Sequence, residues 1–194
     1  MVKKLLVIFI ATIHISFFAY ADSLPLEGKR FGVEFNIPRV LTYSDDWKSV
    51  SGTFSWFDHE NKVEIAVPWL ISADKETDYH NVEIHMDVVD VDIHYRKFLG
   101  EELGGFYMSS FGRVSYLNGL LDREERYKKT TKFGLGVGLG YRFFPKTQRY
   151  YWGVGLIVGR YIIGDNDIYR EVGFGIEDSP YIVDIELLKF GYAF

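Results

Sequence analysis

Apolar and polar side chains alternate along most of this 194-residue chain. In the segment 29–38, for example, Phe31, Val33 and Phe35 alternate with polar or small residues. Side chains two residues apart lie on one face of a strand, so each alternating segment predicts a β-strand with one apolar and one polar face. Eight segments have this pattern: 29–38, 50–57, 62–71, 82–95, 105–117, 132–143, 150–162 and 181–194.

Three irregularities interrupt the alternation. In 82–95 the apolar positions change from even to odd numbers after Val88, and in 181–194 they change from odd to even after Leu187. A single change of phase within a strand predicts a β-bulge. Pro68 lacks an amide donor, so it predicts a bulge or the end of the third strand.

Polar segments of two lengths separate the predicted strands. The longer ones are 39–49, 72–81, 118–130 and 163–180, and the shorter ones lie near His59, Gly100 and Lys146. Alternate connections of an up-and-down antiparallel sheet lie at the same end, so short turns are expected at one end and long loops at the other. This asymmetry and an even strand number are typical of transmembrane β-barrels. Segment 118–130 is too polar for lipid and has room for a short helix.

The N-terminus has the features of an export signal. Lys3 and Lys4 precede an apolar run over 5–18, and Ala19-Tyr20-Ala21 matches the A-x-A cleavage rule. We therefore expect residues 1–21 to be a cleaved signal peptide and residues 22–194 to form one domain.

The composition fits a barrel better than a helical membrane protein. Aromatic residues make up 18% of the chain, yet no second apolar run reaches the length of a membrane helix. In a barrel only every second residue meets lipid, which gives this combination.

The chain has no cysteine, which excludes disulfides and thiolate chemistry. Its net charge of −5 argues against nucleic acid as a partner.

The C-terminus carries a specific resemblance. The chain ends D-I-E-L-L-K-F-G-Y-A-F, with Phe190, Tyr192 and Phe194 at alternate positions. This ending resembles the C-terminal signature of bacterial outer-membrane β-barrel proteins, and the architecture resembles the small OmpA-like and OmpW-like barrels. The resemblance implies an all-β, eight-stranded antiparallel up-and-down transmembrane β-barrel in the outer membrane of a Gram-negative cell envelope. It also implies contact with outer-membrane lipid and recognition of these three aromatics by the barrel-assembly machinery.

The polar strand faces predict a lumen filled with charge. Charges removed from water must be paired, so acidic and basic residues in nearly equal number predict an internal salt-bridge network, and an ion path is the alternative. Eight strands enclose too little space for a porin-sized channel. The expected network is Glu34, Glu64, Glu83, His85, Asp87, Asp90, Asp92, His94, Arg96, Arg113, Lys132, Arg142 and Glu186. Arg30, Lys62, Asp184 and Lys189 lie on the same predicted faces.

Glycines alternate along two neighbouring predicted strands and would leave one wall of the lumen bare. They are Gly134, Gly136, Gly138, Gly140, Gly153 and Gly155. Either large inward residues such as Tyr151, Tyr161 or Arg113 fill the space, or the wall borders a pocket for an acyl chain or another slender ligand. The glycine run lacks the G-x-G-x-x-G spacing and lies within a strand, so it is not a nucleotide-binding loop.

Catalytic and metal-binding patterns are weak. Some outer-membrane barrels that modify lipid A use a catalytic Ser and His. A contact of His85 or His94 with Ser109 or Ser110 across two neighbouring strands would resemble such a catalytic pair. The F-x-H-x-S pattern of the lipid A deacylases is, however, missing from this sequence. Residues 165–167 lack the Gly and Glu of a calcium loop.

We therefore expect no enzyme activity, cofactor or metal. The expected function is a non-catalytic outer-membrane scaffold with external loops; the alternatives are a carrier or narrow conduit for a small hydrophobic ligand, and a lipid-modifying enzyme.

Overall fold

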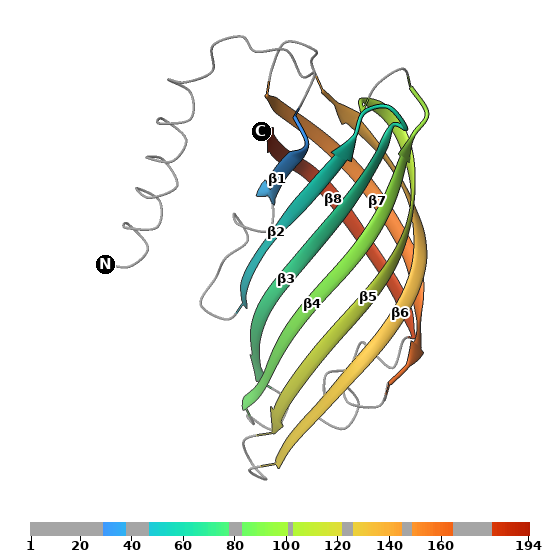
Figure 1. The fold of residues 1–194 in the computed structure, drawn as a ribbon. Helices are drawn as coiled ribbons and strands as arrows, with labels where there is room; N and C mark the ends of the chain where they lie inside the picture. The colour runs from blue at the N-terminus through green and yellow to red at the C-terminus, as the bar shows by residue number, and fades with distance from the viewer. Residues whose placement is uncertain are drawn as a thin grey trace, which may run out of the picture.

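The computed structural model describes residues 29–37, 47–77, 83–100, 103–121, 126–144, 149–164 and 180–194. These residues form a closed antiparallel barrel in which each strand pairs with the next in sequence and the last pairs with the first (Figure 1). The strands are β1 (Phe31–Asn36), β2 (Trp47–Asp58), β3 (Val63–Thr77), β4 (Glu83–Phe98), β5 (Gly105–Leu121), β6 (Arg126–Phe143), β7 (Tyr150–Ile163) and β8 (Tyr181–Ala193). The predicted eight-stranded up-and-down barrel is confirmed, and the predicted signal peptide lies outside the described residues.

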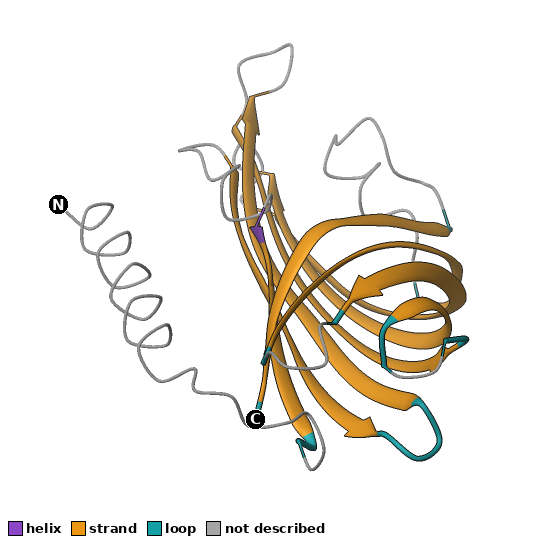
Figure 2. Cartoon of the chain, turned by 90° about the horizontal axis from the view of Figure 1, so that it is seen from above, coloured by secondary structure: helices purple, strands orange, loops and turns teal. Residues whose placement is uncertain are grey.

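The barrel has two different ends. The connections 59–62, 99–104 and 144–149 lie together with the C-terminus at what we call the turn end, which is the upper end in Figure 1. The opposite ends of the strands lie at the other end of the barrel, called the loop end. Seen from above in Figure 2, the strands curve around one lumen, in agreement with the closed pairing order.

The two faces of the wall have inverted chemistry. Large apolar side chains on the outer faces of all eight strands are exposed, among them Ile93 and Val183 at 62% and 68%. We call these side chains the outer apolar belt. In contrast, charged inward side chains such as Glu64 and Arg96 are fully buried. The alternation in the sequence therefore gives the faces correctly, but the apolar face is the exposed one, the reverse of a protein with an apolar core.

The bulge predicted in the last strand is confirmed. The β7–β8 register shifts between Gly153 and Gly155, whose partners are Lys189 and Glu186. Leu188 has a φ of 49°, in the left-handed region that leucine rarely adopts. Because of the extra residue, Glu186 and Lys189 both point into the lumen although they are three positions apart.

The bulge predicted after Val88 is wrong. The β4–β5 register runs without a shift from Ile84 paired with Leu121 to Phe98 paired with Tyr107. Met86 is buried and Asp87 is exposed, so the even-numbered residues face inward along the whole of β4. What changes near Val88 is the chemistry of the two faces: beyond the outer apolar belt the outward residues become polar and the inward ones apolar.

Several predicted strand boundaries, and the interpretation of Pro68, are also wrong. Pro68 is neither a bulge nor an end, because the β2–β3 and β3–β4 registers pass it without a shift. Residues 72–77, 118–121 and 126–130, expected to be loop, belong to β3, β5 and β6. Their polarity argues against burial in an apolar environment but not against strand pairing in water. The connections 78–82 and 122–125 are consequently short, and the expected long loops there are replaced by longer strands.

The barrel is closed by its shortest strand. β1 has six residues, whereas β5 and β6 have 17 and 18. Its pairing with β2 ends at Phe35 opposite Gly52, and its pairing with β8 ends at Asn36 opposite Lys189. At the turn end, Phe31 and Phe194 exchange two backbone hydrogen bonds of 3.1 and 2.9 Å. Beyond Asn36, no described strand lies between β8 and β2.

Candidate functional site

The lumen is the candidate site, and its turn end is closed by packed aromatic rings. Phe57, Phe98, Tyr107 and Tyr151 are buried there together with Leu103 and Ala193. Ring centroids lie 5.2 Å apart for Phe98 and Tyr107 and 6.1 Å apart for Phe57 and Tyr151. We call this cluster the aromatic plug.

Next to the aromatic plug lies a network of three acidic and three basic side chains, called the central network. Its members are Glu34, Glu64, Arg96, Arg142, Glu186 and Lys189, all buried. Arg142 Nη2 lies 2.6 Å from Glu34 Oε1 and 2.8 Å from Glu64 Oε2. Arg96 Nη1 lies 3.4 Å from Glu34 Oε2 and 3.2 Å from Glu64 Oε1, and Lys189 pairs with Glu186. The balance of three positive and three negative groups meets the requirement that buried charges be paired.

Arg142 connects the central network to the aromatic plug. Its guanidinium carbon lies 4.5 Å from the ring centroid of Tyr151, 5.0 Å from that of Phe98 and 5.8 Å from that of Phe57. These are cation–π distances. One side chain therefore satisfies two carboxylates on one side and covers three rings on the other.

A second charged group, called the outer network, lies nearer the loop end. Arg113 Nε and Nη2 donate to the two oxygens of Asp92 over 2.7 and 2.8 Å. Asp90 and Asp184 lie 3.7 and 3.9 Å from the same guanidinium. His94 Nε2 is 3.1 Å from Asp92 Oδ2. Nearby, Lys132 is buried with its ammonium 5.2 Å from the centroid of the Tyr161 ring.

The glycine wall lies against side chains from neighbouring strands. A Cβ placed on Gly140 would be 2.2 Å from the Tyr107 ring, and one on Gly136 would be 2.4 Å from the Phe111 ring. Ile182 occupies the space beside Gly134. Ser109 and Ile157 lie beside Gly138, Glu186 and Tyr107 beside Gly155, and the Tyr141 carbonyl beside Gly153. Inward side chains thus fill the space beside the glycines, as one of the two predictions states. The side chains that fill it are mostly Tyr107, Phe111 and Ile182, and not the predicted Tyr151, Tyr161 and Arg113.

The structure divides the predicted charged residues between the two networks and the outer surface. Glu34, Glu64, Arg96, Arg142 and Glu186 meet in the central network, and Asp90, Asp92, His94 and Arg113 meet in the outer network. Asp87 and His85 were predicted to face the lumen, but both lie on the outer face of β4. Asp87 is exposed and accepts a hydrogen bond from Asn118, and His85 is half-buried. The Glu83 side chain is outside the described part. Arg30 is exposed, and Lys62 lies in a turn.

Ser55 is a partner of the central network that the sequence analysis did not identify. Its hydroxyl donates to Glu64 over 2.5 Å. Ser49, Ser51, Thr53 and Ser55 alternate on β2 with Val50, Gly52, Phe54 and Trp56, and this alternation is the signal that places Ser55 in the lumen.

His94 and Ser109 do not form the hydrogen bond that a catalytic pair would need. His94 bonds to Asp92 and stacks on Phe111, and the buried Ser109 Oγ has no hydrogen-bond partner in the described structure, while Ser110 is exposed. Among the described residues, no group of three or more His, Asp or Glu is arranged to hold a metal ion. Within the same ranges no helix is long and apolar enough to cross a membrane, a result that does not address strands.

The fold and the lumen define the class of protein: a closed eight-stranded antiparallel up-and-down β-barrel with an apolar exterior and a charged interior. Comparisons with family models, with curated proteins and with solved structures find no match to this chain. The functional argument therefore depends on the geometry of the barrel itself.

Proposed function

We propose that this chain is a non-catalytic integral protein of the bacterial outer membrane, a barrel scaffold with external loops and a charge-filled lumen. The observation that carries the proposal is the outer apolar belt, which occurs on all eight strands. Exposed apolar patches of more than a few hundred Å² are rare on monomeric soluble proteins. Lipid removes the free-energy cost of exposing this surface to water, about 25 cal/mol per Å².

The distribution of aromatic side chains supports an orientation. Trp56, Tyr95, Tyr141 and Trp152 are exposed on the outer faces of β2, β4, β6 and β7, close to the turn end. Tryptophan and tyrosine concentrate where the membrane meets water. These side chains place the turn end at one of the two membrane interfaces. We assign that interface to the periplasm because the two longest connections, 37–46 and 164–180, join strand ends at the loop end.

The C-terminal aromatics are placed on the outer surface, where assembly factors have access before the barrel is closed. Phe194 is half-exposed and lies 6.2 Å from Phe31, and Phe190 stacks on Tyr150 at 5.7 Å. Recognition of Phe190, Tyr192 and Phe194 by the assembly machinery, and removal of residues 1–21 during export, belong to the same proposal.

The closed lumen favours a scaffold over a conduit. An ion entering from the turn end meets the aromatic plug and then six mutually paired charges, and displacing them would leave buried groups without partners. No observation favours the lipid-modifying enzyme, because the buried histidine bonds to a carboxylate and not to a serine.

The test substitutes one residue of the outer apolar belt. Val137 is 58% exposed, so Val137→Arg would change the free energy of unfolding of a soluble protein by less than about 0.5 kcal/mol. In a membrane the same change costs about 2–4 kcal/mol near the midplane. The assay is urea unfolding of the protein folded into phosphatidylcholine vesicles, with fractionation of cells that express the full chain. A stable, water-soluble Val137→Arg variant, or recovery of the wild type in the soluble fraction, would refute the proposal.

A further inference from the structure

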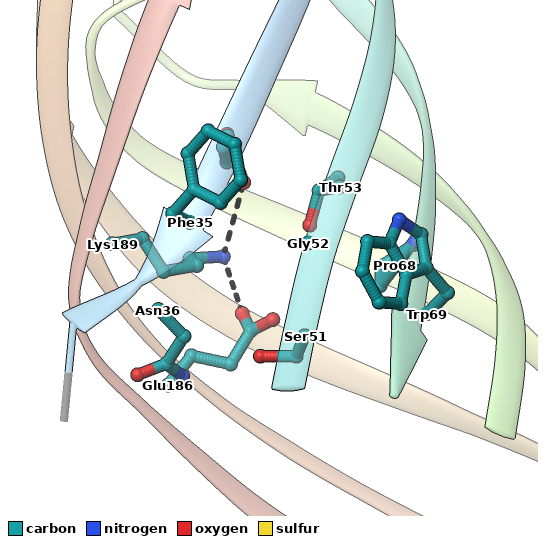
Figure 3. A pocket seen from close by; sticks show the side chains of 10 residues that line it. Phe35, Asn36, Ser51, Gly52, Thr53, Pro68, Trp69, Glu186 and Lys189 are labelled. Atoms are coloured by element: carbon teal, nitrogen blue, oxygen red, sulfur yellow. Dashed lines mark hydrogen bonds and ion pairs between the residues drawn. The ribbon is translucent and has the colours of Figure 1, made fainter. Parts of the chain in front are cut away.

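The wall of the barrel contains a small cleft at the point where β1 ends (Figure 3). Asn36, Ser51 and Thr53 line it on the lumen side together with the Glu186–Lys189 pair, and Phe35 and Trp69 line it on the outer side. The cleft therefore connects the polar interior with the outer apolar belt. Both members of the last two β1–β2 pairs, Glu34 with Thr53 and Phe35 with Gly52, also line it, so it lies at the paired end of β1.

Two buried polar atoms in the cleft have no partner. Asn36 Oδ1 and Ser51 Oγ make no hydrogen bond in the described structure, although Asn36 and Ser51 are 91% and 95% buried. An unsatisfied buried polar group costs about 1–3 kcal/mol. The charged residues beside them are already satisfied, because Lys189 pairs with Glu186 and lies within 3.9 Å of Glu34.

The size and charge of the cleft select the occupant. The cleft is open on one side, and its volume of about 20 Å³ has room for a group about the size of one water molecule. A phosphate or a choline group is too large, and a carboxylate would face Glu186. A hydroxyl has the matching chemistry, since it can donate to Asn36 Oδ1 and accept from Ser51 Oγ.

The outer side offers an apolar surface for the remainder of such a molecule. Phe35 is 54% exposed and Trp69 is 37% exposed. The indole of Trp69 lies over Gly52, where an added Cβ would be 2.8 Å from Cζ2. A straight alkyl chain lying on these rings remains in the region of the outer apolar belt.

We propose that this cleft is a lateral binding site for a long-chain alcohol, with its hydroxyl between Asn36 and Ser51 and its alkyl chain against Phe35 and Trp69. The site rests on the proposed membrane location, because the ligand reaches it from the lipid phase. Binding at this site does not require an open lumen, so it is compatible with the proposed scaffold, whose lumen is closed by the aromatic plug.

The test uses Trp69 as a fluorescent reporter. Trp47, Trp56 and Trp152 are replaced by Phe, and the protein is folded into phosphatidylcholine vesicles that contain 9,10-dibromostearyl alcohol, dibromostearic acid or dibrominated phosphatidylcholine at equal mole fraction. We expect the alcohol to quench Trp69 at least twofold more than brominated phosphatidylcholine does. We also expect unlabelled oleyl alcohol to reverse the excess.

Three variants in the same background identify the site. Asn36→Leu and Ser51→Val should each remove the excess quenching, whereas Ser49→Val, on the same face of β2 but outside the cleft, should retain it. If one variant fails to fold, as judged by heat-modifiable mobility on gels, the other decides. Equal quenching by all three probes, or a larger excess with the fatty acid, would overturn the inference. Brominated phosphatidylcholine separates the two proposals: no quenching by it refutes the membrane location, whereas quenching without an alcohol excess refutes only the site.

Discussion

Arg142 provides the sharpest test of how the lumen is held together. Its guanidinium contacts Glu34 and Glu64 at 2.6 and 2.8 Å, and all three side chains are at most 2% exposed. Arg142→Met keeps most of the side-chain volume but leaves the central network with one uncompensated negative charge. Removing one partner of a buried ion pair typically costs about 3–5 kcal/mol, and the lost cation–π contacts add about 0.5–2 kcal/mol. We expect a total loss near the upper end of the first range.

A second substitution tests whether charge balance is the cause. Glu64→Gln alone leaves one uncompensated positive charge, but with Arg142→Met it restores a neutral network of two acidic and two basic side chains. The double variant should therefore lose less than the sum of the two single losses. Coupling energies between contacting residues reach about 3 kcal/mol, and we expect about 2 kcal/mol here.

The measurement is the free energy of unfolding from urea titration in short-chain phosphatidylcholine vesicles, followed by tryptophan fluorescence and by mobility on gels. Arg160→Met is the matched control, because Arg160 is exposed and its guanidinium lies over the Tyr181 ring at 6.0 Å. It should change stability by less than about 0.5 kcal/mol and be additive with Glu64→Gln. A loss below about 1 kcal/mol for Arg142→Met, or strict additivity of the double variant, would refute the charge-balance argument.

Two further predictions concern packing and a turn. Gly136→Ala should destabilise the barrel by about 1–3 kcal/mol, because the new Cβ would lie 2.3 Å from the backbone oxygen of Val158. Gly112→Ala, whose Cβ would have no neighbour closer than 3.6 Å, should change the urea midpoint little, and equal effects of the two would contradict the packing argument. At the β2–β3 turn, hydrogen bonds from Asn61 hold the pKa of the Asp58 carboxyl below its ordinary value. The stabilisation by the ionised Asp58 carboxylate is present above the unfolded pKa of about 3.9 and is lost as pH falls through the folded pKa. The difference in urea midpoint between wild type and Asp58→Asn should therefore shrink over that pH range. A difference that stays constant with pH would contradict the role of these hydrogen bonds.

Much of the fold can be read from the sequence because the side-chain period of a strand is fixed at two. The same rule located the bulge near Leu188, where both Glu186 and Lys189 had to face the lumen. The rule failed in β4 because alternation reports a difference between two faces and not which face meets water, lipid or lumen. Beyond the outer apolar belt, the outward side chains of β4 are polar and the inward side chains are apolar. A straight strand with this exchange has the same sequence pattern as a strand with a bulge. Polar strand ends in β3, β5 and β6 were mistaken for loops for the same reason.

The pairing of the charges was beyond sequence reasoning. Arg142 and Glu34 are 108 positions apart, and their contact depends on the registers of the intervening strands and on the depth of each residue in the barrel. The cleft at Asn36 was equally hidden, because it exists only where β1 ends earlier than the alternation in 29–38 predicts.

The short β1 explains why the central network lies where it does. A strand of six residues contributes few ladder hydrogen bonds to close the barrel. Glu34 compensates, because its carboxylate contacts Arg142 of β6, Arg96 of β4 and, at 3.9 Å, Lys189 of β8. One side chain of the closing strand is thereby attached to three other strands across the lumen. The central network therefore connects the short closing strand to the rest of the barrel, and the cleft lies where its members Glu34, Glu186 and Lys189 meet the end of the β1 ladder.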